Sequence, residues 1–264
     1  DWGWRELTDL SKTASYSSKD GNDAFRLFVN PDTQQVVIAF KGTDTATQFK
    51  NDLTNAGAAD YTNIRSLAQA ALLKIQQNPG YAGYQIFTDG HSLGGGMAQS
   101  FALENGLSGF GQNSLPVATE TITNYFPSTA DFNTALQNYQ AGLVQDSGGN
   151  TAHFKEVNVA GDPATLAYSG GAYLDNSPTT LSSPYSAIER AATPLSMFSS
   201  IAGISLEAWA RYKMHSIDTV NSLTNANGDQ TTQTNASGTI TTQYSDGSAS
   251  TTVAHPDNST TVST

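Results

Sequence analysis

One serine of this chain stands in a context typical of a catalytic nucleophile. Ser92 is the centre of a Gly-x-Ser-x-Gly pattern at 90–94, and a run rich in β-branched and aromatic residues precedes it at 84–88. Apolar residues after Ser92 repeat at the four-residue spacing of a buried helical face. The sequence therefore predicts a strand, a sharp turn and a helix, with the Ser92 hydroxyl projecting into solvent where a substrate carbonyl reaches it.

A serine nucleophile needs a base, and the chain offers only four histidines. His91 adjoins the nucleophile and is expected to face away from it, His153 precedes a strand-like run, and His255 lies in a polar tail. His215 follows a helix-like stretch late in the chain, which is where the base falls when the order is Ser, Asp, His. Elimination therefore assigns the base to His215.

The base needs an orienting carboxylate between Ser92 and His215 in the chain. The aspartate candidates in this interval are Asp131, Asp146, Asp162 and Asp175. Asp162 comes directly after the strand-like run at 153–159, and active-site residues of open α/β sheets lie just beyond the carboxyl ends of strands. Position therefore favours Asp162, with Asp175 as the runner-up.

Two backbone N–H groups are needed to bind an oxyanion near Ser92. One is expected from Leu93, the residue after the nucleophile, at the positive end of the helix dipole. The second is expected from Thr43, because Lys41-Gly42-Thr43 follows the apolar run at 35–40. The same three residues also fit an ordinary turn with no catalytic role.

The order of predicted elements indicates one α/β domain at 1–223. Apolar runs at 24–29 and 35–40 flank turn residues and predict a hairpin. A helical spacing at 64–75 leads into the strand before Ser92, so we expect a mostly parallel sheet with right-handed crossovers. The later predictions are strands at 116–125 and 153–159 and helices at 129–144 and 188–212.

Residues 224–264 are rich in Thr, Ser, Asn and Gly and repeat turn residues and β-formers about every nine or ten positions. Each unit fits one strand of a small β-repeat layer, and a disordered linker fits the same composition. The units lack the glycine–aspartate pattern of calcium-binding nonapeptides, so no calcium is expected there.

The composition of the chain argues against several classes of binding partner. The 264 residues carry a formal net charge of −11 and no cysteine. Acidity argues against nucleic acid as a partner, and no run is long and apolar enough for stable membrane insertion. The absence of cysteine excludes disulfides and a thiol nucleophile and suits an extracellular, secreted bacterial protein.

These motifs together resemble the class 3 lipase family. The resemblance covers roughly 24–220 and rests on the strand and oxyanion turn at 36–43, the nucleophile motif at 88–95, the Asp-bearing strand at 156–163, and His215. Lys41, Phe49 and Asp89 depart from the family pattern. The segments 106–113 and 147–151 look like loops peculiar to this chain.

The resemblance implies an α/β-hydrolase that cleaves lipid or other esters without a cofactor or metal. Triacylglycerol is the expected substrate, with phospholipid A1-type, short-chain and feruloyl esters as alternatives. Two segments compete as the lid, 44–60 and 194–209. A different class, a non-catalytic hydrolase-like binding module of a larger secreted repeat protein, is the second hypothesis.

Overall fold

The computed structural model divides the chain into two compact units. The first comprises 1–156 and 167–178, and the second 157–166 and 179–264. The residues that the structure describes are 3–7, 15–17, 24–42, 58–117, 124–162, 165, 171–181, 230–234, 239–244, 249–254 and 260–263. The predicted helix at 188–212 and the predicted domain boundary at 223/224 lie outside them.

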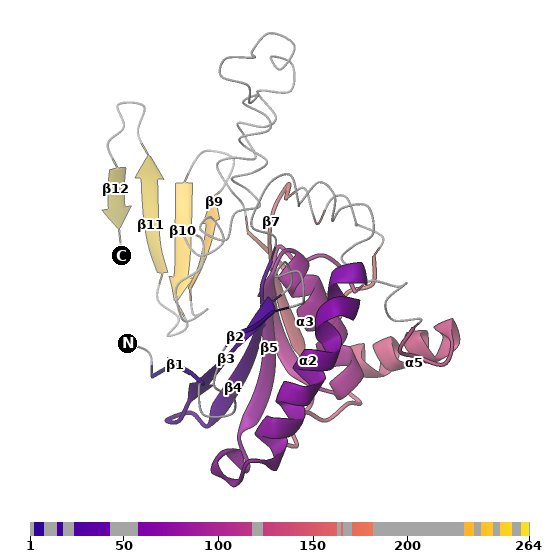
Figure 1. Cartoon of the computed structure of the whole chain (residues 1–264). Coiled ribbons are helices and arrows are strands. Elements are labelled where there is room, and N and C mark those ends of the chain that lie inside the picture. The colour runs from indigo at the N-terminus through magenta and orange to yellow at the C-terminus, as the bar shows by residue number, and fades with distance from the viewer. Residues whose placement is uncertain are drawn as a thin grey trace, which may run out of the picture. The chain divides into compact units, whose positions relative to one another are not determined.

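The first unit is built on a sheet that is antiparallel at one edge and parallel at its centre. Strand β3 (Ala24–Asn30) pairs antiparallel with β1 (Arg5–Glu6), β2 (Ser15–Ser17) and β4 (Gln35–Phe40). Strand β5 (Gln85–His91) pairs parallel with β4 and with β6 (Ser108–Gln112). The predicted hairpin and the predicted parallel sheet are both confirmed (Figure 1).

The helices are α2 (Ala58–Gln77), α3 (Leu93–Asn105) and α5 (Thr129–Gln140), with a short 3₁₀ turn, η1 (Pro79–Tyr81). Helix α3 packs on the sheet: Thr88 Oγ1 donates to Ala98 O at 3.1 Å. The rings of Phe25, Phe40 and Phe101 follow one another at 5.8 and 5.6 Å between centroids. These contacts place the core between α3 and the sheet, as the apolar spacing after Ser92 predicts.

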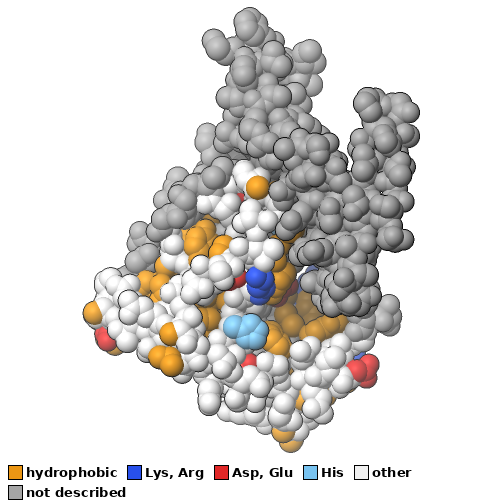
Figure 2. Space-filling model, turned by 180° about the vertical axis from the view of Figure 1, so that it is seen from behind, with side chains coloured by type: hydrophobic (Ala, Val, Ile, Leu, Met, Phe, Trp, Pro, Cys, Tyr) orange, Lys and Arg blue, Asp and Glu red, His pale blue; other side chains and the backbone are white. Residues whose placement is uncertain are grey.

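The opposite face of the sheet is less covered. Neighbouring strand positions alternate between faces, and several of those pointing away from α3 are only half-buried. They include Phe28, Val37, Phe87 and Phe110. Figure 2, seen from behind the view of Figure 1, shows hydrophobic side chains gathered in patches among polar ones.

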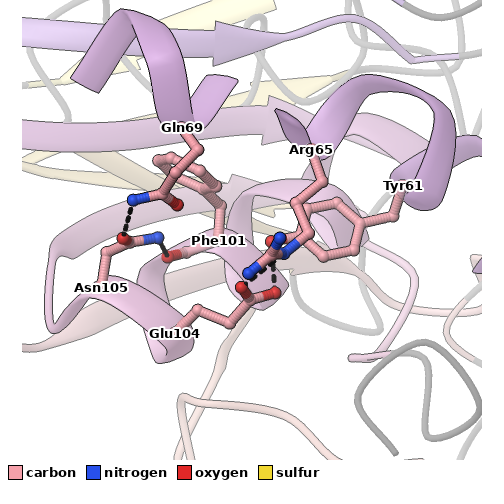
Figure 3. Close-up of polar contacts among 6 residues, drawn as sticks. All are labelled: Tyr61, Arg65, Gln69, Phe101, Glu104 and Asn105. Carbon is pink, nitrogen blue, oxygen red and sulfur yellow. Dashed lines mark hydrogen bonds and ion pairs between the residues drawn. The ribbon is translucent and has the colours of Figure 1, made fainter. Parts of the chain in front are cut away.

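A polar cluster joins α2 to α3 (Figure 3). Tyr61 Oη donates to Glu104 Oε1 and Arg65 Nε donates to Glu104 Oε2, both at 2.7 Å, while Gln69 Nε2 donates to Asn105 Oδ1 at 2.9 Å. Burial beside the Glu104 carboxylate raises the pKa of the Tyr61 hydroxyl well above its ordinary value. A hydroxyl that keeps its proton stays a donor, so the cluster fixes how α2 lies against α3.

One predicted strand is described only at its two ends, and one strand of the sheet was not predicted. A strand was expected at 116–125, but Val117 forms only an isolated bridge, to Ala172, and 124–125 form a turn, while 118–123 lie outside the description. The next sheet strand is instead β6, within the segment expected to be a loop. Because Gly109 and Gly111 have low β-propensity, the sequence does not indicate this strand. The packing requires them, since a Cβ on either glycine would overlap neighbouring side chains, among them the ring of Phe154.

Strand β7 (Phe154–Val159) begins in the first unit and ends in the second, where it pairs parallel with β8 (Thr179–Leu181). The predicted strand at 153–159 and the predicted helix at 129–144 are thus confirmed, the helix ending at Gln140.

The tail forms a four-stranded antiparallel sheet, as the β-repeat interpretation predicts. Its strands are β9 (Gln230–Thr234), β10 (Thr239–Tyr244), β11 (Ala249–Ala254) and β12 (Thr260–Ser263).

Candidate active site

Ser92 occupies the turn between the end of β5 and the start of α3. Its backbone has φ 59° and ψ −125°, a conformation that residues with a side chain rarely adopt. Holding a residue there costs about 1–3 kcal/mol, and such strain persists only where the surrounding structure imposes it. The predicted strand, sharp turn and helix are therefore confirmed at Ser92.

Two glycines let the backbones around Ser92 interlock. A Cβ on Gly90 would overlap the backbone of Gly94, and one on Gly94 would overlap Phe40 O and lie 2.8 Å from the carbonyl carbon of Lys41 and 2.9 Å from Gly42 N. Real Cβ atoms do not approach backbone this closely, so only glycine fits at either position. The ends of β4 and β5 and the first turn of α3 therefore meet at the nucleophile motif.

The expectation of a solvent-facing hydroxyl is wrong, because only 2% of Ser92 is exposed. Its N–H donates to Gln112 O at 3.0 Å, and its carbonyl accepts from Leu115 N at 3.0 Å and Gly96 N at 3.2 Å. The ends of β4 and β6 and the helix pack around it on several sides. Both segments predicted as the lid, 44–60 and 194–209, lie outside the described residues, except that α2 starts at Ala58.

Of the two expected oxyanion donors, the structure describes one. Leu93 is the first residue of α3, and the first N–H groups of a helix have no partner within that helix. Its N–H therefore lies at the positive end of the helix dipole, directly after Ser92. Thr43 lies outside the description, which stops at Gly42.

The four aspartate candidates have different environments. Asp131 is exposed and caps the first turn of α5 with Ser128. Asp146 accepts from Gln85 and Ser108, at the amino ends of β5 and β6, which is the wrong end of the sheet for Ser92. Asp175 binds the backbone N–H groups of Glu156 and Ser177, both at 2.9 Å. These three carboxylates hold local structure.

Asp162 lies three residues beyond the end of β7 and is fully buried. Its N–H donates to Val159 O at 3.0 Å, and its Oδ1 accepts from Thr165 N at 2.9 Å. A buried carboxylate in a turn beyond a strand end fits the position expected of the orienting residue. Ser92 and Leu93 belong to the first unit and Asp162 to the second.

The histidines are described only in part. His215 and His255 lie outside the described residues, so the predicted base stays a prediction. His153 is exposed just before β7, with its Nδ1 3.2 Å from Thr151 O. His91 is the last residue of β5 and half-buried. Among the described residues, no group of three or more His, Cys, Asp or Glu side chains is arranged to hold a metal ion.

Asp89 is a half-buried acid three residues before Ser92. It lies inside β5 and points away from α3. Burial raises the pKa of the Asp89 carboxyl from 3.8 to about 6, although a hydrogen bond from Gly90 N opposes the shift. Its buried Oδ1 has no hydrogen-bond partner among the described residues.

A nucleophile turn on a central parallel sheet flanked by helices defines the α/β-hydrolase class. A family model described as "Phospholipase-like: Tle-like phospholipase domain" matches residues 2–188, and the chain belongs to this family. The match includes Ser92 and Asp162 and ends before His215. No curated protein sequence matches the chain. In the described part, no helix combines the length and apolar character needed to span a membrane.

Similar solved structures include three fungal lipases. The lipase of Rhizopus microsporus var. chinensis is 13% identical, with a TM-score of 0.41 over 61% of this chain and 55% of that one. The Rhizomucor miehei triacylglyceride lipase is 14% identical, with a TM-score of 0.44 over 68% and 66%. Lip2 lipase of Yarrowia lipolytica is 14% identical, with a TM-score of 0.45 over 67% and 66%. The chain thus spans 55 to 66% of the length of these lipases.

Replacing Gly94 with Ala tests the interlocked backbones. Gly to Ala inside a helix ordinarily stabilises by up to about 1 kcal/mol. Here we expect Gly94→Ala to lower the thermal midpoint, because the new Cβ meets the backbone of Phe40, Lys41 and Gly42. Gln76→Ala, on the exposed face of α2, is the control and should leave the midpoint unchanged. An unchanged or higher midpoint for Gly94→Ala would contradict the close approach.

The shifted pKa of Asp89 predicts a pH-dependent cost. Because the folded pKa of about 6 exceeds the unfolded value of 3.8, the buried charge destabilises the protein above pH 6, and the cost disappears below about pH 4. Asp89→Asn should therefore raise stability by roughly 2 kcal/mol at pH 8 and by little at pH 4. Thermal midpoints across this range, with the exposed Asp131→Asn as control, measure the effect. An equal gain at both pH values would contradict it.

Proposed function

We propose that this chain hydrolyses carboxylic esters of lipids through an acyl-enzyme on Ser92. The Ser92 hydroxyl attacks the ester carbonyl and passes its proton to His215, while Asp162 orients the imidazole and stabilises its cation. The N–H groups of Thr43 and Leu93 bind the oxyanion, each contributing roughly 3 kcal/mol. The alcohol leaves with the proton that His215 returns, and water then releases the acid by the same steps.

The observation that carries this proposal is the strained backbone of Ser92 at the start of α3. A glycine would adopt φ 59° at no steric cost, yet a serine stands there, between two glycines that are needed for close packing. A hydroxyl at the N-terminus of a helix, beyond the end of a parallel strand, suits attack on a carbonyl whose oxygen becomes negative. The fully buried Asp162 beyond β7 supports the second member of the triad.

The family description favours a phospholipid ester as the substrate class. A phospholipid and a triacylglycerol present the same ester to the nucleophile and differ in the head group, so the Ser92 chemistry serves both. The choice between them depends on the residues that line the acyl and head-group sites. We therefore propose phospholipid hydrolysis first and triacylglycerol hydrolysis second.

Kinetics of triad variants test the proposal. Ser92→Ala should lower kcat by on the order of 10⁴-fold or more, and His215→Ala and Asp162→Asn by roughly 10²- to 10⁴-fold. Ser100→Ala is the matched control, because Ser100 is a buried serine of the same helix whose Oγ donates to Gly96 O within that helix. Release of fatty acid from phospholipid vesicles, triacylglycerol emulsion and short-chain p-nitrophenyl esters provides the readout.

The panel also separates the alternatives. A kcat/KM that is highest for phospholipid supports the proposed substrate class. A higher kcat/KM for triacylglycerol or for short-chain esters contradicts it and makes that ester the substrate class instead. If wild-type protein hydrolyses no ester, or if Ser92→Ala retains the activity, the catalytic proposal fails. Wild-type protein that hydrolyses no ester would favour the hypothesis of a non-catalytic binding module.

A further inference from the structure

We propose that Glu156 is a positioning residue for the nucleophile, acting through the loop at 112–115. The proposal rests on the function proposed for Ser92. Glu156 belongs to β7 and takes no part in the mechanism above. It acts on Ser92 through backbone hydrogen bonds in the first unit.

The 112–115 loop holds both backbone polar groups of the nucleophile. Ser92 N donates to Gln112 O, and Leu115 N donates to Ser92 O, each at 3.0 Å. Between these two contacts the loop passes through Asn113, which has φ 45° and is fully buried. A short loop that contains a left-handed, non-glycine residue does not keep its shape by local preference alone.

The Glu156 side chain, which comes from strand β7, holds the 112–115 loop in place. Its Oε1 accepts from Ser114 N at 2.9 Å, and the whole residue is buried. A hydrogen bond to a carboxylate is about twice as strong as one between neutral groups. The Glu156 backbone is itself held, because its N–H donates to Asp175 Oδ2 at 2.9 Å. The hydrogen bonds thus run from Asp175 through Glu156 and the 112–115 loop to Ser92.

The packing leaves this path little room to move. A Cβ on Gly111 would overlap both the Glu156 carboxylate and Ser114 Oγ, and a Cβ on Gly95 would overlap Ser114 Oγ. On the α3 side, Gln99 Nε2 donates to Leu115 O at 2.9 Å. The loop is therefore fixed from β7 by Glu156 and from α3 by Gln99.

Burying a carboxylate costs free energy unless hydrogen bonds or ion pairs compensate it, so its position is tied to its partners. The peptide that follows Ser92 carries the Leu93 N–H, the expected oxyanion donor. A small displacement of Ser92 would misplace both its Oγ and that N–H. Such an error reduces the rate of the chemical step more than it reduces substrate binding.

The test compares variants of Glu156 on a soluble p-nitrophenyl ester. Glu156→Ala should lower kcat by about 10- to 100-fold with KM changed less than about threefold. Glu156→Gln keeps an Oε1 acceptor for Ser114 N, so it should restore kcat to within about fivefold of wild type with an unchanged pH profile. Glu156→Asp withdraws the oxygen by one methylene, so its kcat should lie between those of the alanine and glutamine variants. If the alanine variant does not fold, the comparison of kcat between Glu156→Asp and Glu156→Gln tests the proposal.

Asp146 provides the matched control. It is also a buried carboxylate that holds a loop, accepting from Gly148 N and Asn150 N, but at the amino ends of the strands. Asp146→Ala should lower the thermal midpoint and leave kcat of the folded protein unchanged. An equal loss of kcat in Asp146→Ala would show that Glu156 acts only through stability.

The outcomes separate this proposal from the one on which it rests. Wild-type activity that Ser92→Ala abolishes, together with unchanged kcat in Glu156→Ala, overturns the positioning role alone. A pH profile shifted in Glu156→Gln overturns it in favour of a titrating role for Glu156. Absence of any wild-type ester hydrolysis overturns both proposals.

Discussion

The described site depends on the close approach of backbones around Ser92. The end of β4, the end of β5 and the first turn of α3 come so near one another that Gly90 and Gly94 cannot carry a Cβ. This contact leaves the intervening residue with φ 59° and ψ −125°. The strain is the consequence of packing, and the packed core on α3 supplies the free energy that maintains it.

Four buried or half-buried acids of the described chain have separate tasks. Asp146 and Asp175 bind backbone or side-chain donors and hold loops and strands in place. Glu156 binds Ser114 N in the loop that is hydrogen-bonded to the Ser92 backbone. Asp162 lies beyond a strand end, where catalytic residues of α/β sheets are expected. Residue type alone does not distinguish these four acids, whereas their places in the fold do.

The sequence predicted those elements whose residue preferences agree with their structure. The hairpin of β3 and β4, the strand β5, the helix α3 and the strand β7 follow from apolar spacing and turn residues. Strand β6 was missed because Gly109 and Gly111 make room for larger neighbours, a requirement set by residues far away in the chain. At the two described ends of the predicted strand 116–125, Val117 forms only an isolated bridge and 124–125 form a turn, so apolar and β-branched character there did not produce a sheet strand.

The candidate site was predictable in part for the same reason. The nucleophile motif is local, so Ser92 and Leu93 could be placed from a few neighbouring residues. The burial of Ser92 and the role of Glu156 arise from contacts between β5, β6, α3 and β7, and no local pattern encodes them. The one signal for Glu156 was an acid in the middle of a strand-like run, because a buried acid needs a specific partner.

The central claim is that Ser92 is a nucleophile activated by its surroundings, and covalent labelling tests it most directly. The full chain is treated with a fluorophosphonate probe, and intact-mass and peptide mass spectrometry locate the adduct. The account predicts about one adduct per chain, on Ser92, and none in Ser92→Ala under the same conditions. Labelling of another serine, or no labelling of the folded wild-type protein, would contradict it.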